Sequence, residues 1–282
     1  MLASLLHTSL MFDLSISIVL YNNKEKQIQN LLDCFCSTTL SYKIYLVDNS
    51  PTDELKILAT GNNVEYIFND KNIGYGSAHN IALRKVIDQN KYHLILNPDV
   101  TFRNGVLEEI YKYMELNNDV GQLIPKVLYP DGSLQYVCKL IPAPFNLISR
   151  LLPGNLLKNY NEKFELRFSG YNKIMDVPYL SGCFMFLRCS ALKEVGIFDE
   201  QFFMYPEDID LTRRMHKKYK TVFYPYVEIF HEHAKSSFKN MRMFGIHITN
   251  MVKYFNKWGW FFDNERKRVN KVVLQQLKQN TK

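Results

Sequence analysis

Hydrophobic positions in the first hundred residues follow two spacings, one typical of strands and one typical of helices. Apolar runs rich in β-branched residues predict strands, and apolar residues three or four positions apart predict helices. Strands that alternate with helices are typical of βαβ units, so we expect an α/β fold with a mostly parallel central sheet flanked by helices. The predicted strands are residues 14–21, 43–47, 64–69 and 93–96, and the predicted helices are residues 24–37, a stretch from Glu54 onward, and a stretch ending near Gln89.

The second half of the chain repeats these patterns around one irregular stretch. Residues 141–175 carry prolines and aromatics without a regular spacing, and such a long connection is often a binding loop or a lid. A strand pattern over 177–188 contains a kink at Ser181-Gly182. The other predicted elements are helices at 105–117, 190–196, 208–218 and 238–277, and strands at 121–129 and 220–224.

Three acidic segments fall at the ends of predicted elements. Asp48 follows the second strand and Asp99 follows the fourth, and ligands of open parallel sheets bind beyond the carboxyl ends of the strands. The third segment, Glu207-Asp208-Ile209-Asp210, begins a helix, where the helix dipole favours negative charge. By itself that segment is explained as a well-capped helix start. Together the three segments predict one cleft that handles a metal ion and a phosphorylated sugar.

Two further motifs leave alternatives open. Gly74-Tyr75-Gly76 precedes a helix, where glycines allow close backbone approach and the helix N-terminus favours anions. It lacks the third glycine of a dinucleotide-binding motif, so a plain turn and a ligand contact both remain open. His231 and His233 lie two residues apart in a predicted extended segment and therefore point to opposite sides. Only one of them could face a metal in the cleft.

Charge and cysteine content restrict the classes of partner. The 282 residues are 46% hydrophobic with a net charge of +7, which suits phosphate-bearing substrates, anionic lipids or nucleic acid, or serves solubility alone. We expect no nucleic-acid partner, because no recognised binding motif occurs. The five cysteines match neither a zinc pattern nor a disulfide framework and predict reduced thiols in a cytosolic protein.

The ends of the chain bear on membrane contact. Residues 1–12 lack the basic region and cleavage site of a signal peptide, and no run reaches the ~20 apolar residues of a spanning helix. Residues 238–282 interleave aromatic with basic side chains. Such a helical segment either lies on an anionic membrane surface or packs its aromatics on the core. We expect a domain over residues 14–237 followed by this C-terminal segment.

Taken in order, short motifs along residues 14–262 resemble those of family-two glycosyltransferases with the GT-A fold. The similarity is greatest to the rhamnosyltransferase-like branch of bacterial surface polysaccharide synthesis. Each motif is weakly specific alone, and their order and spacing carry the resemblance. The motifs are Ile18-Val19-Leu20-Tyr21-Asn22, Val47-Asp48-Asn49-Ser50, Asn72-Ile73-Gly74-Tyr75-Gly76 with Asn80, Asn97-Pro98-Asp99, Leu180-Ser181-Gly182, Phe198-Asp199-Glu200, Glu207-Asp208-Ile209-Asp210-Leu211 with Arg214, and His231 with Ser236-Ser237.

The resemblance assigns roles to these positions. Asp208 would be the general base of the reaction, and Glu207 would support the acceptor site. Asp99, in a metal motif where Asn97 replaces one acid, would contact a divalent cation, Mg²⁺ or Mn²⁺, with His231 completing the metal shell in some relatives. The residues implied to bind the nucleotide-sugar are Tyr21 and Asp48 at the base and ribose, Asn72 and Gly74 beside the nucleotide, Asn97 and Asp99 at the diphosphate, and Arg214, which would steady the acidic cluster or the phosphates.

The implied activity is inverting transfer of one sugar. One base deprotonates the acceptor while a cation neutralises the leaving diphosphate. The QxxRW motif of processive synthases is absent, which favours adding a single sugar to a lipid-linked or growing surface glycan. dTDP-rhamnose is the favoured donor. A UDP-hexose-dependent transferase and a non-catalytic nucleotide-sugar-binding protein of the same fold are the alternatives. The expected location is the cytoplasmic, inner face of the plasma membrane, with peripheral association.

Overall fold

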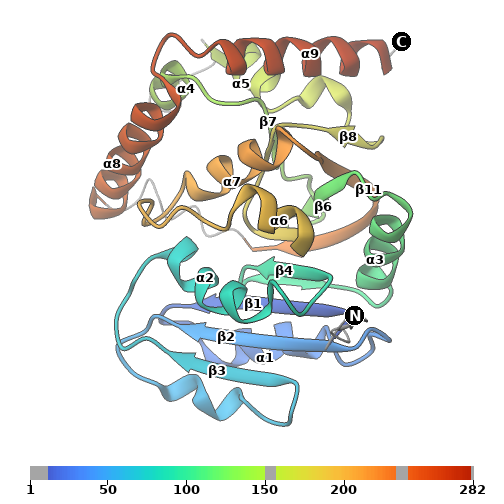
Figure 1. Ribbon diagram of the computed structural model, residues 1–282, viewed down its shortest axis with the longest axis vertical. Helices are drawn as coiled ribbons and strands as arrows, with labels where there is room; N and C mark the ends of the chain where they lie inside the picture. Colours follow the sequence, from blue (N-terminus) through green and yellow to red (C-terminus); the bar gives the residue numbers. More distant parts are fainter. Residues whose placement is uncertain (1–11, 150–156, 233–240, 281–282) are drawn as a thin grey trace, which may run out of the picture.

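The computed structural model describes residues 12–149, 157–232 and 241–280 and has an α/β architecture built on a nine-stranded sheet (Figure 1). This confirms the expected fold class. A two-residue strand, β8 (Met175–Asp176), pairs with β11 beside the main path of the sheet. The order along that path is β3 (Val64–Phe68), β2 (Tyr42–Asp48), β1 (Leu14–Leu20), β4 (Tyr92–Leu96), β10 (Phe184–Arg188), β6 (Val120–Leu128), β11 (Lys220–His231) and β5 (Val100–Phe102).

The parallel arrangement holds in the first half of the sheet and changes at β10. Strands β3, β2, β1 and β4 pair in parallel, as do β6 and β11. Strand β10 is antiparallel to both β4 and β6. The chain turns at Ser181–Cys183, where the sequence predicted a kink within one strand over 177–188, and the structure has two strands there. β9 (Tyr179–Leu180) pairs with β7 (Cys138–Lys139) in a separate two-stranded sheet.

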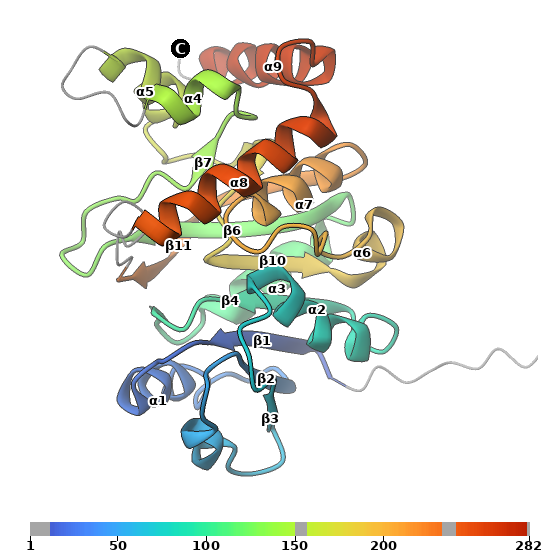
Figure 2. The same ribbon diagram turned by 90° about the vertical axis from the view of Figure 1, so that its left-hand side faces the viewer.

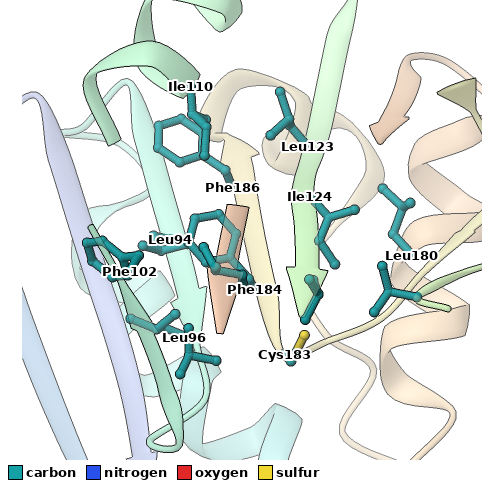
Figure 3. Close-up of a cluster of buried hydrophobic side chains, with 14 of the residues drawn as sticks. Leu94, Leu96, Phe102, Ile110, Leu123, Ile124, Leu180, Cys183, Phe184 and Phe186 are labelled. Carbon is teal, nitrogen blue, oxygen red and sulfur yellow. The ribbon is translucent and has the colours of Figure 1, made fainter. Parts of the chain in front are cut away.

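Helices cover both faces of the sheet because strand side chains alternate between them. Helices α1 (Glu25–Asp33) and α3 (Val106–Leu116) share one buried cluster with Leu94 and Leu96 of β4. Figure 3 shows these leucines with Phe184, Phe186 and Cys183, where β10 begins. The opposite face of β4 carries Ile95, which packs among α2 (Tyr75–Val86), α6 (Cys189–Val195) and α7 (Glu207–His216).

Several predicted elements have different bounds in the structure. The stretch 141–175 is less irregular than expected, because it contains α4 (Pro144–Ser149), α5 (Lys158–Phe164) and a 3₁₀ turn at Arg167–Ser169. The helical stretch after Glu54 is a 3₁₀ helix that ends at Leu58. Strand β11 continues to His231, seven residues past the predicted end, since it pairs with β6 and then with β5.

The C-terminal segment forms two helices, α8 (Met241–Trp258) and α9 (Asn264–Asn280), separated by a bend at Gly259 with φ +99°. Figure 2 shows α8 running obliquely past α7. Tyr254 and Phe255 of α8 are buried, and the Trp258 indole N–H donates to Asp210 Oδ1 at 2.8 Å. Of the two alternatives for the C-terminal segment, its aromatic side chains therefore mostly pack on the core. The expected domain boundary at residue 237 lies outside the described residues and stays a prediction.

Candidate active site

A cavity of about 670 Å³ lies where β1, β2 and β4 end and α7 begins. Strands β1, β2 and β4 are parallel, so the residues that follow them meet at one edge of the sheet. Asp99 and Asp208, far apart in the sequence, both line this cavity. Seven of the residues proposed from the sequence line it: Tyr21, Asn72, Asn97, Asp99, Glu207, Asp208 and His231.

Asp48 lies behind the cavity lining. Its side chain is fully buried, with Oδ1 accepting from the Ser50 amide at 2.8 Å and Oδ2 accepting from the Tyr66 hydroxyl at 2.6 Å. The next residue, Asn49, does line the cavity, and its amide donates to Asn72 Oδ1 at 3.3 Å. Asp48 therefore shapes the turn that presents Asn49 and Asn72.

Gly74 provides a close backbone approach. Its φ is +94°, and a Cβ there would lie 2.6 Å from the Phe203 carbonyl oxygen, so a side chain would meet both strain and a clash. The Tyr75 amide donates to the same carbonyl at 2.9 Å. Gly74 thus joins the turn after β3 to the loop that leads into α7. Of the two alternatives for this motif, the geometry favours a packing turn at Gly74, with Tyr75 reaching the cavity.

Arg214 does not line the cavity, so it does not carry over as a phosphate ligand. Its Nε donates to Asp210 Oδ2 at 2.8 Å, and its terminal nitrogens donate to the carbonyls of Val195, Gly196 and Ile197. The Arg214 guanidinium therefore donates its hydrogen bonds to acceptors of the protein itself. This geometry fits the other role considered for Arg214, that of steadying the acidic first turn of α7.

The first turn of α7 places two carboxyl groups side by side in the cavity. Asp208 Oδ2 accepts from the Gly182 amide at 3.0 Å and Oδ1 accepts from the Ile209 amide at 2.7 Å. Burial raises the pKa of Asp208 to about 6, and the nearby charge of Lys139 opposes this rise. Burial and the charge of Asp208 raise the pKa of Glu207 well above its ordinary value. Both carboxyl groups of the pair therefore hold their protons more tightly than exposed carboxyl groups do.

Glu207 has an unused oxygen. Its side chain is buried, and Oε2 finds no hydrogen-bond partner among the residues that the structure describes. A buried polar atom left without a partner costs free energy, so it marks a place where a ligand contact would be favourable. A bound acceptor hydroxyl would satisfy this oxygen.

Lys139 is a cavity residue that the sequence analysis missed. The pairing of β7 with β9 brings it to the lining, where its ammonium lies 5.1 Å from the centre of the Tyr179 ring. Because this pairing involves only two residues on each strand, it leaves no periodic pattern in the sequence. Lys139 nevertheless contributes a positive charge near the Asp208 carboxylate.

Asp99 and His231 form the second charged group of the cavity. The pairing of β11 with β5 brings His231 Nε2 to 3.2 Å from Asp99 Oδ1. Burial lowers the pKa of His231, but Cys183 and the Asp99 carboxylate outweigh this effect and raise it to about 10. Among the described residues no cluster of three or more acidic, histidine or cysteine side chains could enclose a metal ion.

The donor atoms near Asp99 fit a divalent cation that a substrate helps to bind. A carboxylate and an imidazole suit Mn²⁺ as ligands, and phosphate oxygens of a diphosphate would supply further positions. Asp99 and His231 would hold such an ion. Ser236-Ser237, which belong to the same motif as His231, lie outside the described residues, as does His233.

Helix α8 forms a wall of the cavity that the sequence did not indicate. Phe244, His247 and Met251 lie three and four residues apart, share one face of the helix and line the cavity. The His247 ring packs edge-on against Tyr205 at 4.7 Å. Tyr205 has φ +91°, an unfavourable conformation for an aromatic residue, and it lies two residues before Glu207.

Comparisons with known families and curated proteins point to one enzyme class. The family model described as "Glycosyl transferase family 2" matches residues 15–196. The chain is 27% identical to a low-salt glycan biosynthesis hexosyltransferase of Haloferax volcanii, over 73% of this chain and 62% of that protein. It is 27% identical to the N-acetylglucosaminyl-diphospho-decaprenol L-rhamnosyltransferase of Mycobacterium tuberculosis, over 71% of this chain and 70% of the relative. It is 28% identical to the rhamnosyltransferase WbbL of Escherichia coli, over 84% of this chain and 90% of that protein.

Solved structures with the same fold are more distant in sequence. The crystal structure of GalNAc-T7 with UDP, GalNAc and Mn²⁺ matches with a TM-score of 0.58 at 14% identity, over 78% of this chain and 43% of that one. The structure of Staphylococcus aureus TarS matches with a TM-score of 0.59 at 16% identity, over 93% of this chain and 43% of the TarS chain. At such identities the likeness supports the fold alone. Helices α7 and α8 lie beyond the region of the family model.

Proposed function

The chain belongs to glycosyl transferase family 2, and we propose that it transfers one sugar from a nucleotide-diphosphate donor to an acceptor hydroxyl, with inversion at the anomeric carbon. The acceptor is a lipid-linked or growing cell-surface glycan. Because two of the relatives are named rhamnosyltransferases, dTDP-rhamnose is the favoured donor, and a UDP-hexose is the alternative. The observation that carries the proposal is that Asp99 and Asp208 face the same cavity from different elements.

The donor and the acceptor would bind at different ends of the cavity. Tyr21, Asn49 and Asn72, which follow β1, β2 and β3, provide the polar surface for the nucleotide. Asp99 and His231 take the diphosphate end. A divalent cation bound there would neutralise the negative charge that develops on the departing diphosphate. The α7 turn and the α8 wall border the acceptor.

Asp208 has the properties that a general base requires. With a pKa of about 6, its carboxylate is ionised at neutral pH and still accepts a proton. As the acceptor oxygen attacks the anomeric carbon, its proton passes to Asp208. The new carbon–oxygen bond forms while the bond to the diphosphate breaks, and the electron pair leaves with the nucleoside diphosphate. Glu207 would hold the acceptor by a hydrogen bond at Oε2.

The proposal is tested by assaying the purified protein with dTDP-rhamnose and a panel of UDP-hexoses. The acceptor is N-acetylglucosaminyl diphosphate carried on a short isoprenoid. We expect release of nucleoside diphosphate together with a product whose anomeric configuration, read by NMR, is opposite to that of the donor. A product with retained configuration would exclude the single-base mechanism. Absence of turnover with every donor would remove the proposed substrates.

Lys139→Met is expected to move the acidic limb of the pH–rate profile to higher pH. Burial raises the pKa of Asp208, and the charge of Lys139 lowers it toward the ordinary value. Without that charge Asp208 loses its proton only at higher pH, so the rate falls off earlier on acidification. The profile of kcat/KM between pH 5 and 9 measures this. Lys173→Met, outside the cavity lining, is the matched control. An unmoved limb in Lys139→Met would show that Asp208 does not set it.

We propose peripheral membrane contact through the bend between α8 and α9. Phe261 and Phe262 are 70% and 93% exposed there, and Lys267 and Arg268 are exposed on the following turn of helix. Apolar side chains beside basic ones suit an anionic bilayer surface. No helix in the described residues is long and apolar enough to cross a membrane.

A Phe261→Ser/Phe262→Ser double variant is expected to lose most of its binding to anionic vesicles in a flotation assay. The matched control is Ile57→Ser/Leu116→Ser, which removes two side chains of similar exposure, 68% and 75%, elsewhere on the surface. The contact at the bend is disproved if both double variants float as well as the unmodified protein.

A further inference from the structure

The hydroxyl of Tyr75 determines how the Asn97 amide is oriented. Tyr75 Oη lies 2.8 Å from Asn97 Oδ1 and 2.9 Å from the Gly182 carbonyl oxygen. A phenol carries one proton, so it cannot donate to both oxygens. The Gly182 carbonyl is fixed by the backbone, whereas a side-chain amide can reverse. With the proton given to Gly182, the Asn97 amide nitrogen donates to Tyr75 Oη, and Asn97 Oδ1 turns toward the cavity.

The amide group of Asn97 also lies beside the Asp99–His231 pair. On that side it is 3.5 Å from His231 Nε2, which in turn lies 3.2 Å from Asp99 Oδ1. A separation of 3.5 Å does not fix which amide atom faces the ring, so the orientation of Asn97 is set by Tyr75. With that orientation, Asn97 Oδ1 lies on the same side as His231 Nε2 and the Asp99 carboxylate.

Gln135 fixes the opposite nitrogen of the His231 ring. The Gln135 side chain is buried, and its Nε2 donates to the His231 carbonyl at 2.6 Å and to the Leu128 carbonyl at 3.3 Å. The remaining atom, Oε1, lies 3.0 Å from His231 Nδ1. Because Oε1 only accepts, Nδ1 carries a proton. A cation can then replace a proton only at Nε2, the nitrogen that faces the cavity.

We infer that Tyr75 and Gln135 are positioning residues of a divalent-cation site, which aim Asn97 Oδ1 and His231 Nε2 at the same point as the Asp99 carboxylate. This inference rests on the proposed function, because it assigns that cation to the diphosphate end of the cavity. It gives the site three donor atoms, two oxygens and a nitrogen, although the Asn97-Pro98-Asp99 motif carries one acid. Neither positioning residue would itself touch the cation.

Binding of Mn²⁺ alone, without donor or acceptor, tests the inference independently of catalysis. The free Mn²⁺ signal in electron paramagnetic resonance gives the affinity of the full-length protein. Loss of the groups that orient metal ligands typically weakens affinity about 10- to 100-fold, and we expect a change of this size in Gln135→Met and in Tyr75→Phe. Gln135→Glu keeps an acceptor for Nδ1 but loses the amide that donates to the His231 carbonyl, so we expect Mn²⁺ affinity to recover in part.

Two control variants separate positioning from general damage to the fold. Gln122→Met removes another buried glutamine, which donates to Thr212 at 3.1 Å. Tyr171→Phe removes another buried hydroxyl, whose oxygen lies 2.9 Å from the Cys138 carbonyl oxygen and 2.7 Å from that of Glu165. Both lie outside the cavity lining, and we expect both to retain the Mn²⁺ affinity of the unmodified protein. Nucleoside diphosphate binding in EDTA should stay within about twofold in Gln135→Met and Tyr75→Phe.

The outcomes distinguish the inference from the proposed function. Mn²⁺ affinities of Gln135→Met and Tyr75→Phe within twofold of the unmodified protein overturn the positioning role. An unmodified protein that binds no Mn²⁺ also overturns it, while leaving transfer through Asp208 to be judged by the donor assay. Weakened Mn²⁺ binding in these variants, restored in part by Gln135→Glu, supports the positioning role even where the donor panel identifies no substrate.

Discussion

Asp208→Asn is expected to abolish most sugar transfer while leaving donor binding intact. An amide cannot take the proton of the acceptor hydroxyl, and loss of a general base typically lowers the rate by about 10²- to 10⁴-fold. The hydrogen bonds from the Gly182 and Ile209 amides reach two different oxygens of Asp208, and the substitution keeps one of these oxygens. Steady-state kcat at saturating donor and acceptor measures the effect.

The same substitution is expected to stabilise the fold. Burial raises the pKa of Asp208 from its ordinary value of 3.8 to about 6. A carboxyl whose folded pKa lies above its unfolded pKa contributes stability that is fully present below pH 3.8 and lost as the pH rises through 6. At pH 7.5 the ionised group therefore destabilises the fold by about 3 kcal/mol, at roughly 1.4 kcal/mol for each pKa unit. Asparagine removes this cost but turns its NH₂ group toward one of the two backbone N–H groups, so we expect Tm to rise by less than this figure implies.

Asp210→Asn, in the same helix, is expected to lower Tm and to leave the transfer rate unchanged. Asp210 is fully buried, accepts from Trp258 Nε1 and Lys257 Nζ on Oδ1, and accepts from Arg214 Nε on Oδ2. Its substitution weakens these contacts, so Tm should fall while the folded protein keeps its transfer rate. If Asp208→Asn retains transfer, Asp208 is not the base. If Asp210→Asn also loses transfer at a temperature where the variant is folded, the loss in Asp208→Asn is not specific to that carboxylate.

The elements that the sequence predicts well are those with a local periodic signal. The first four predicted strands and the helix at residues 208–218 appear within a few residues of their expected bounds, because burial on one or both faces imposes a pattern on consecutive residues. The C-terminal end of β11 and the two-residue strand β7 were missed, and β9 was predicted as one strand with β10. Their positions depend on pairing with distant strands, which leaves no repeat in the sequence.

The residues of the candidate site also fall into two groups, those predicted from the sequence and those that only the structure reveals. Asp99 and Asp208 were found because they follow recognisable elements and belong to motifs of the family. Lys139 and Gln135 were not found, because each reaches the site through contacts with residues about 40 to 100 positions away. Tyr75 stood within a quoted motif, yet its role depends on the Gly182 carbonyl, which only the turn between β9 and β10 brings into reach. Tertiary contacts of this kind require coordinates.

Asp99→Asn is expected to lower kcat/KM by roughly 100-fold or more and to remove activation by Mn²⁺ and Mg²⁺. The Asp99 carboxylate is the charged ligand of the proposed cation site, and its Oδ1 lies 3.2 Å from His231 Nε2. A neutral amide in its place binds a hard cation more weakly. Without that charge the departing diphosphate lacks stabilisation, a loss of the size seen when one preorganised charge-stabilising group is removed. Initial rates across a Mn²⁺ titration, with EDTA as the zero point, measure the effect.

The chain offers a matched control for Asp99 in a second carboxylate–histidine pair. Asp176 Oδ1 lies 3.3 Å from His216 Nδ1, and neither residue lines the cavity. Asp176→Asn should keep both the transfer rate and its dependence on Mn²⁺, because it changes the same chemical pair away from the diphosphate end. Unmodified protein that transfers sugar equally well in EDTA would disprove the cation requirement, and Asp99 would then act on the diphosphate by position alone. Equal rates for Asp99→Asn and Asp176→Asn would remove Asp99 from the site altogether.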